Sequence, residues 1–377
     1  MVHKDKLARL LWQLDPVYGH APWRASPTVA ERVLHVHLST PEEPQRSLCL
    51  ALASLAIPGA CRRVDWTTLA SAPQRQRAVV EAAAEHRPTL VFMQLQSPGV
   101  LAAEAVAAMR RAATTPELVV VCWCGDVGGV NGPGPDAASR WAFAMAEQCD
   151  LMLYTSMSQV RAHRSHGMHN AAYLQIGFDE DRYHEGPDAG YGSRHDIVFL
   201  GNRCDPSDWG SLPGEEAGLR NTVVERMRAL HKERFGLYGA SWGAPVSPLA
   251  PALSGDAYRS SRLAISVSVS SRLERYSSDR LFRALACGTP VLLKSFDDWP
   301  SFGLADKDNV LCWDTPDQAV DLAQRWLTAP NQAALRAIGR RGAQLAREHH
   351  GWGTRMQELF PLLMAARGQR AEVWRPW

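Results

Sequence analysis

YSSDRLFRALACGTPVLL, residues 276–293, predicts a capped α-helix that leads directly into a buried β-strand. Ser278 or Asp279 can cap the helix, because a short polar side chain there accepts hydrogen bonds from the free backbone N–H groups of the first turn. Gly288 is typical of a helix end, and the apolar residues 291–293 follow as a strand. Helices that alternate with apolar strands are the pattern of parallel α/β proteins.

The same alternation extends along the whole chain in both directions. Further strands are predicted over 33–38, 63–66, 90–93, 118–123, 151–154, 172–176, 197–200, 235–238 and 263–269. Helices are predicted over 44–56, 73–86, 102–113, 137–148, 159–166, 219–231, 279–287, 316–327 and 331–349. A polar stretch rich in turn-forming residues, 184–193, interrupts the series. We therefore predict two Rossmann-like domains, one over 1–185 and one over 195–350.

Composition restricts the class of protein. The 377 residues carry a formal net charge of +2, which gives no electrostatic reason to expect a polyanionic partner. Most of the eight cysteines lie in apolar runs, which is typical of buried free thiols and favours a cytoplasmic protein. No apolar run approaches the roughly 20 residues that a membrane helix needs. We also expect no metal site, since Cys122 and Cys124 lack zinc-ligand spacing and His35 and His37 lack a nearby third ligand in the sequence.

Two loops after predicted strands are candidate phosphate-binding segments. In open parallel sheets, ligands bind beyond the carboxyl ends of the strands, so two facing sheets would form a cleft between them. Gly201, Asn202 and Arg203 follow strand 197–200, and Gly239 follows strand 235–238. Glycine allows a ligand to approach the backbone closely. Arg203 could offset phosphate charge, or it could be an ordinary solvated loop arginine.

The start of the helix in 276–293 is a second candidate site for phosphates. Ser278, Asp279 and Arg280 lie where a helix offers free N–H groups and the positive end of its dipole, which together suit a diphosphate. Arg280 can add a charged fork. The alternative is an ordinary capped helix.

On the acceptor side, Asp126 follows the most apolar strand and stands in a glycine-rich loop. A carboxylate there suits a catalytic base or a substrate-binding group, and the alternative is an Asx-turn that stabilises the loop. The segment 161–169 carries a local run of arginine and histidine, which we expect to be an exposed helix face. That face could meet an anionic acceptor.

Several of these segments together resemble the group-1 glycosyltransferases of the GT-B fold. ALACGTPV, residues 284–291, is similar to the family's "EAxAxGxPVV" segment, and SDRLF, residues 278–282, looks like the "SDRxYE" variant of the branch that includes spore-maturation-protein-like glycosyltransferases. IVFLGN (197–202), LQIGFD (174–179) and VCWCGD (121–126) resemble the other motifs of that branch in the same order.

The resemblance implies two facing Rossmann-like domains, with the acceptor in the first and a nucleoside-diphosphate sugar in the second. It also implies that the C-terminal segment 351–377 forms a helix that crosses back to the first domain. The expected activity is that of a hexosyl- or pentosyltransferase. We expect the reaction to proceed without a metal or other cofactor, because the helix dipole and arginines can stabilise the leaving diphosphate.

The chain departs from the family at Arg283, where the family usually has a glutamate that accepts hydrogen bonds from the donor ribose. Arginine has only donors. It stands four residues after Asp279, so the two side chains can pair across one helical turn. Two alternatives therefore stay open: a nucleotide-binding homologue without transferase activity, and a phage-type enzyme that transfers sugar to modified bases in DNA. The sugar, the nucleotide and the acceptor are not determined by the sequence.

Overall fold

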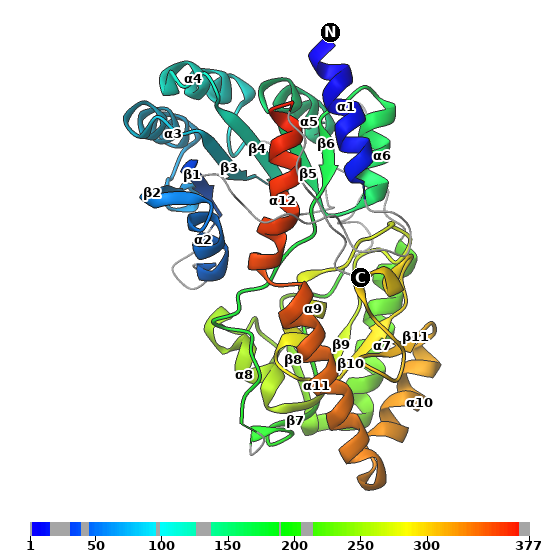
Figure 1. The fold of residues 1–377 in the computed structure, drawn as a ribbon. Coiled ribbons are helices and arrows are strands. Elements are labelled where there is room, and N and C mark those ends of the chain that lie inside the picture. The colour runs from blue at the N-terminus through cyan, green and yellow to red at the C-terminus, as the bar shows by residue number, and fades with distance from the viewer. Residues whose placement is uncertain are drawn as a thin grey trace. The chain divides into compact units, whose positions relative to one another are not determined.

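The computed structural model describes residues 2–15, 31–38, 45–95, 99–125, 137–187, 190–204 and 214–368. These residues form two compact units, one made of Met1–Ile176 with Trp352–Trp377 and the other of Gly177–Gly351. The break in the chain thus falls at Ile176, ahead of the stretch 184–193 in which the sequence analysis placed it. Figure 1 shows the elements of both units. No helix among the described residues is long and apolar enough to cross a membrane.

Unit 1 is built on a sheet of six parallel strands in the order β2-β1-β3-β4-β5-β6. The strands are β1 (Glu31–His37), β2 (Ala56–Asp65), β3 (Leu90–Gln94), β4 (Val119–Cys124), β5 (Leu151–Tyr154) and β6 (Ala171–Tyr173). The helices are α1 (Val2–Leu14), α2 (Arg46–Ala53), α3 (Ala72–His86), α4 (Ala103–Ala113), α5 (Ala137–Gln148), α6 (Met157–Ser165) and α12 (Trp352–Ala366), with a short 3-10 turn, η1 (Trp66–Thr68).

Side chains that alternate along the strands supply two separate hydrophobic cores in unit 1. Along β4, Val120, Cys122 and Cys124 pack with α3, α4, α5 and α6, whereas Val119, Val121 and Trp123 pack with α1, α2 and α12. This period of two is what a strand covered on both faces requires. Cys122 and Cys124 therefore lie on the same face of β4.

Unit 2 is built on five parallel strands in the order β11-β10-β9-β7-β8. The strands are β7 (His195–Leu200), β8 (Phe235–Tyr238), β9 (Ser261–Ser266), β10 (Val291–Lys294) and β11 (Leu311–Trp313). The helices are α7 (Gly214–His231), α8 (Ser254–Arg259), α9 (Asp279–Ala286), α10 (Pro316–Trp326) and α11 (Gln332–His349), and the 3-10 turns are η4 (Lys232–Arg234), η5 (Pro251–Leu253), η6 (Trp299–Phe302) and η7 (Ala329–Asn331).

The first strand of each unit lies between the second and the third strand of that unit, so the strand order reverses beside it. In unit 2 this is β7, between β8 and β9; in unit 1 it is β1, between β2 and β3. Doubly wound sheets bind ligands at the carboxyl end of such a switch point. The predicted α/β class is confirmed by both sheets.

Three elements were not predicted, and β2 is much longer than the strand predicted over 63–66. α1, α8 and β11 carry weak signals, because α1 is rich in charge and the other two are only 6 and 3 residues long. β2 begins at Ala56 although Pro58 and Gly59 are strand breakers, and Trp66 belongs to the 3-10 turn that follows it. β2 is an edge strand, where such residues are tolerated.

Candidate functional site

The loops that follow β7 and β8 pack against each other at two glycines. A Cβ atom on Gly239 would lie 2.1 Å from the carbonyl oxygen of Gly201, so both chain segments depend on the missing side chain. The Oδ1 atom of Asn202 accepts a hydrogen bond of 2.9 Å from the N–H of Ala240, and the N–H of Arg203 donates to the carbonyl of Ala240 at 3.0 Å. The Asn202 side chain therefore holds the two loops together.

Two guanidinium groups meet at the carboxyl end of β9, next to these loops. Arg280, in the first turn of α9, donates from Nη2 to the carbonyl oxygen of Val267 at 3.3 Å. Arg220, on α7, donates from Nη2 to the same oxygen at 2.9 Å and from Nη1 to Sγ of Cys204 at 2.6 Å. A Cβ atom on Gly201 would lie 3.5 Å from Nη1 of Arg280, so this guanidinium also borders the loop after β7. Two positive charges thus stand at the switch point of unit 2.

Polar atoms around these arginines are buried without a hydrogen-bond partner. Ser278 occupies the N-cap position of α9, but its side chain does not cap the helix, and its Oγ atom is buried and unbonded. The Oγ atom of Ser266 and the Nε atom of Arg280 are also buried and form no hydrogen bond. Among the described residues, Arg280 forms no ion pair. Buried polar groups are nearly always bonded, so three unbonded atoms close to two guanidinium groups make this end of the sheet a candidate site for a polar ligand.

The other predicted donor residues have partners within the protein. Asp279 pairs with Arg283 at 2.8 Å, which confirms the predicted contact across one turn of α9. Arg203 pairs with Glu225 at 2.7 Å and lies over the ring of Trp242, so its guanidinium points to α7. Trp242 itself packs in the hydrophobic core and donates to the carbonyl of Gly201 at 2.7 Å.

Arg220, which the sequence analysis missed, carries no local signal because it lies about 60 residues from Arg280 in the chain.

Asp126 lies outside the described residues, and its predicted role on the acceptor side stays a prediction. The expectation of one exposed basic face over 161–169 holds for Arg161, His166 and His169, which are exposed, and fails for two other residues of the run. His163 is buried against the ring of Tyr154, and Arg164 pairs with Asp15 at 2.5 Å. The helix turns these two side chains inward, so the run does not form a continuous cationic surface.

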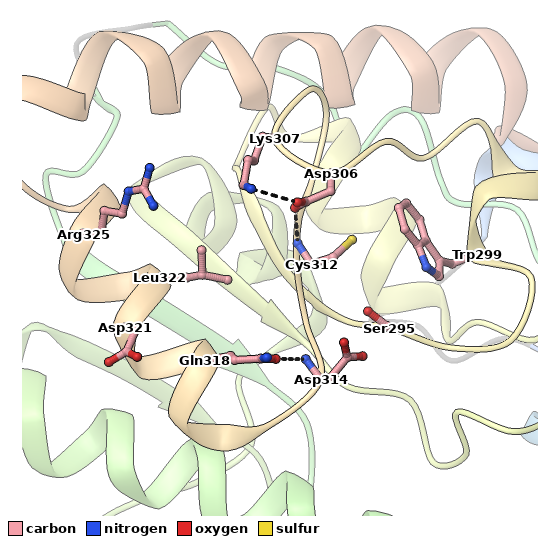
Figure 2. Close-up of a pocket in the computed structure, with 10 residues that line it drawn as sticks. All are labelled: Ser295, Trp299, Asp306, Lys307, Cys312, Asp314, Gln318, Asp321, Leu322 and Arg325. Carbon is pink, nitrogen blue, oxygen red and sulfur yellow. Dashed lines mark hydrogen bonds and ion pairs between the residues drawn. The ribbon is translucent and has the colours of Figure 1, made fainter.

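A pocket of about 650 Å³ lies at the carboxyl ends of β10 and β11, beside α10. Figure 2 shows Asp306 between Lys307 and the backbone N–H of Cys312, and Gln318 bonded to the N–H of Asp314. Burial, followed by the charges of Asp306 and Asp314, raises the pKa of the Cys312 thiol to about 12. The pocket contains none of the predicted donor residues, and its acidic lining suits a diphosphate poorly.

Unit 1 carries a buried polar cluster at its own switch point. His35 and His37 on β1 are 1% and 0% exposed, and Nε2 of His37 lies 3.8 Å from Sγ of Cys49 on α2. Burial lowers the pKa of both histidines, for His35 well below its ordinary value, while the bond to Asp65 opposes the shift for His37. Cys49 on α2 is therefore a third potential metal ligand beside the two histidines, a group that the sequence alone did not reveal.

Comparisons with known proteins agree with this fold. Residues 220–360 match a family model described as glycosyl transferase-like. The crystal structure of Alr3699/HepE from Anabaena in complex with UDP is similar at a TM-score of 0.54 and 12% identity, over 87% of this chain and 98% of that chain. A glycosyltransferase from Rickettsia africae ESF-5 is similar at a TM-score of 0.55 and 10% identity, over 89% and 98% of the two chains.

A putative UDP-N-acetylglucosamine 2-epimerase from Listeria monocytogenes is also similar, at a TM-score of 0.52 and 13% identity, over 90% and 99% of the chains. No curated protein matches the chain in sequence. The protein has the GT-B fold, and the family model that matches residues 220–360 agrees with the resemblance predicted from the sequence. The spore-maturation branch stays a prediction.

Proposed function

We propose that the protein transfers a sugar from a nucleoside-diphosphate sugar, whose diphosphate is bound by Arg220, Arg280 and the N-terminus of α9. The observation that supports this most is the meeting of the two guanidinium groups at the carbonyl of Val267, at the switch point of the sheet. Arg280 has no carboxylate partner among the described residues, so its charge is available to an anion.

The same groups suit the chemistry of sugar transfer. When the bond between the anomeric carbon and the diphosphate breaks, negative charge grows on the leaving phosphate oxygens. Fixed guanidinium groups and helix N–H groups stabilise that charge without rearranging, and a divalent cation is then not needed for this step. Asp126 is proposed, from the sequence alone, as the base or binding group for an acceptor that is not identified.

A thermal-shift screen of UDP-, GDP-, ADP-, CDP- and TDP-linked sugars tests the donor site. A ligand at 100 times its Kd stabilises the folded state by about 2.7 kcal/mol, which gives a readily measured rise in Tm. Arg280→Gln should abolish the shift. Arg325→Gln is the matched control, because Arg325 is exposed and lines the pocket of Figure 2. If only Arg325→Gln removed the shift, the donor would bind in that pocket and the proposed site would be wrong.

A nucleotide-binding homologue without transferase activity is the second candidate, because Arg283 replaces the usual glutamate and is held in an ion pair. The two functions differ in their products. With the donor that gives the largest shift, a transferase releases the free nucleoside diphosphate as sugar moves to an acceptor or to water. Binding without release of the diphosphate in the presence of a panel of sugar, lipid and DNA acceptors would favour the second candidate.

A further inference from the structure

Three side chains in unit 1 are arranged like the ligands of a metal ion. His35 and His37 project from the same face of β1, with ring centroids 4.4 Å apart, and Cys49 faces them from α2. One possible ligand atom from each residue lies within 4.8 Å of the other two. A small movement would bring all three atoms to within 2.0–2.3 Å of one ion, the distances at which nitrogen and sulfur bind zinc.

Each of the three groups is held by an outer partner. Nδ1 of His37 lies 2.9 Å from Oδ1 of Asp65, at the end of β2, which leaves the Nε2 atom of His37 directed at Cys49. Nε2 of His35 lies 3.0 Å from Oε1 of Gln94, at the end of β3. A carboxylate or carbonyl oxygen bonded to the second ring nitrogen is the usual support of a metal-bound histidine.

The thiol is supported as well. Nη1 of Arg63 donates to Sγ of Cys49 at 3.7 Å, and Nε of Arg63 pairs with Asp65 at 2.9 Å. An N–H donor stabilises a thiolate, and the pair with Asp65 offsets part of the arginine charge that would otherwise oppose a cation.

We propose that His35, His37 and Cys49 bind a divalent transition metal of the zinc type. Two imidazoles and one thiolate form a borderline-soft ligand set, which suits Zn²⁺ and Co²⁺ better than Mg²⁺ or Ca²⁺. Within the part of the chain that the structure describes, three protein ligands meet here, and a zinc site with three protein ligands has a fourth tetrahedral position for water or a substrate oxygen. The site lies at the switch point of β1 and β3, where a sheet of this class binds its ligand. It changes the expectation, drawn from the sequence, that the protein has no metal site.

The same groups have one competing interpretation, in which His37 and Asp65 activate Cys49 as a nucleophile. That arrangement does not need His35, whereas the metal site does. Substitution of His35 therefore distinguishes the metal site from the activated nucleophile.

Titration of the chelator-treated, full-length protein with Co²⁺ tests the proposal. We expect one Co²⁺ per chain, with the thiolate-to-metal absorption band and strong visible bands of tetrahedral cobalt, both removed by added Zn²⁺. Cys49→Ser should abolish the thiolate band, and His35→Gln should weaken binding at least tenfold. Cys312→Ser, which changes a half-buried thiol in unit 2, should change nothing.

A variant that keeps all three ligands tests the site in case the ligand substitutions prevent folding. Asp65→Asn keeps the ligands and should weaken Co²⁺ binding by about 10- to 100-fold, as loss of an outer partner does elsewhere. The proposal is overturned if the parent protein shows no thiolate band, if the band persists in Cys49→Ser, or if His35→Gln binds Co²⁺ as tightly as the parent.

Discussion

Arg283 is the residue at which the chain departs most clearly from the glycosyltransferases it resembles, and the structure gives it a definite partner. Its Nη2 atom lies 2.8 Å from Asp279, and its guanidinium carbon lies 5.1 Å from the ring centroid of Tyr183. In this position Arg283 neutralises the one carboxylate in the first turn of α9. It therefore leaves the helix N-terminus favourable to an anion.

Arg283→Glu, which restores the family residue, should weaken donor binding. The substitution removes one ion pair across a helical turn and adds one repulsion, which together lower the stability of α9 by about 0.4–1 kcal/mol. The new carboxylate also repels the diphosphate directly. Titration with the nucleotide-sugar that gives the largest thermal shift measures the effect, and Arg283→Gln separates loss of charge from reversal. Tighter binding by Arg283→Glu would mean that the parent has a decayed ribose pocket, and the homologue without activity would then be the better interpretation.

Arg220 should contribute as much to donor binding as Arg280, although nothing in the sequence distinguished it. A charge-assisted hydrogen bond contributes about 1.5–3 kcal/mol, so Arg220→Met should weaken nucleotide-sugar binding by roughly 10- to 100-fold. Arg226→Met is the control on the same helix, because Arg226 is half-exposed and pairs with Asp317. Equal affinities of the two variants in a calorimetric titration would exclude Arg220 from the site.

Residues that act locally could be predicted, and those that meet through the fold could not. The pairing of Asp279 with Arg283 follows from helix geometry alone, and the glycines after β7 and β8 follow from their places at strand ends. Arg220 lies about 60 residues before Arg280 in the chain, and Cys49 lies on α2, 12 residues after His37. Neither helix carries a sequence pattern that marks these two residues as part of a site. The sequence analysis expected no metal site at His35 and His37 because it found no third ligand nearby. The packing of α2 against β1 places Cys49 beside them.

At the scale of elements, α9 is held in place by its close packing on α11. A Cβ atom on Gly339 of α11 would lie 2.3 Å from the carbonyl oxygen of Gly288 and 2.8 Å from Cδ of Pro290. Backbone and a proline ring cannot yield easily, so this contact fixes the end of α9 and, through it, the N-terminus that carries the candidate site.

Gly339→Ala should therefore destabilise the protein by about 1–3 kcal/mol, the usual cost of overpacking, in spite of the better helix propensity of alanine. Gly218→Ala provides the opposite case, since Gly218 lies in α7 and no atom that the structure describes is within 4 Å of an added Cβ. That substitution should stabilise the helix by about 0.4–1 kcal/mol. Urea denaturation of both variants measures the two signs; a stabilised Gly339→Ala protein would show that α9 and α11 pack less tightly than described.

Most helices and strands could be predicted because their apolar residues form a clear run or a helical period. Elements without such a pattern could not be predicted. β5, β8 and α5 have the bounds that the sequence predicts, because each has a clear run or period between turn residues. β11 is only 3 residues long and is stabilised by pairing with β10, and β2 tolerates Pro58 and Gly59 because it lies at a sheet edge. Such elements are determined by their neighbours more than by their own residues.

The chain passes between the two units twice, because unit 1 contains both the first and the last segment of the sequence. After unit 2, α12 returns to the sheet of unit 1, where Trp352 contacts Trp123 edge to face with ring centroids 5.6 Å apart. Arg355 and Glu358 of α12 form a buried ion pair of 2.7 Å, and Arg355 also donates to the carbonyl of Ile176 at 3.4 Å. α12 therefore completes one of the two cores of unit 1.

A chain that ends at Gly351 should accordingly lose stability in unit 1 and keep it in unit 2. Removal of 352–377 exposes Trp123 and the apolar face on which Met356 and Leu359 pack, and burial of one large apolar side chain contributes about 1.5–3 kcal/mol. Calorimetry should show a lower or absent transition for unit 1, while hydrogen exchange in β7, β9 and α9 stays as slow as in the parent. Nucleotide-sugar binding by Arg220 and Arg280 should persist, because both residues and Val267 belong to unit 2. Loss of slow exchange in both units together would instead mean that they fold as one cooperative body, and the assignment of α12 to unit 1 alone would have to be abandoned.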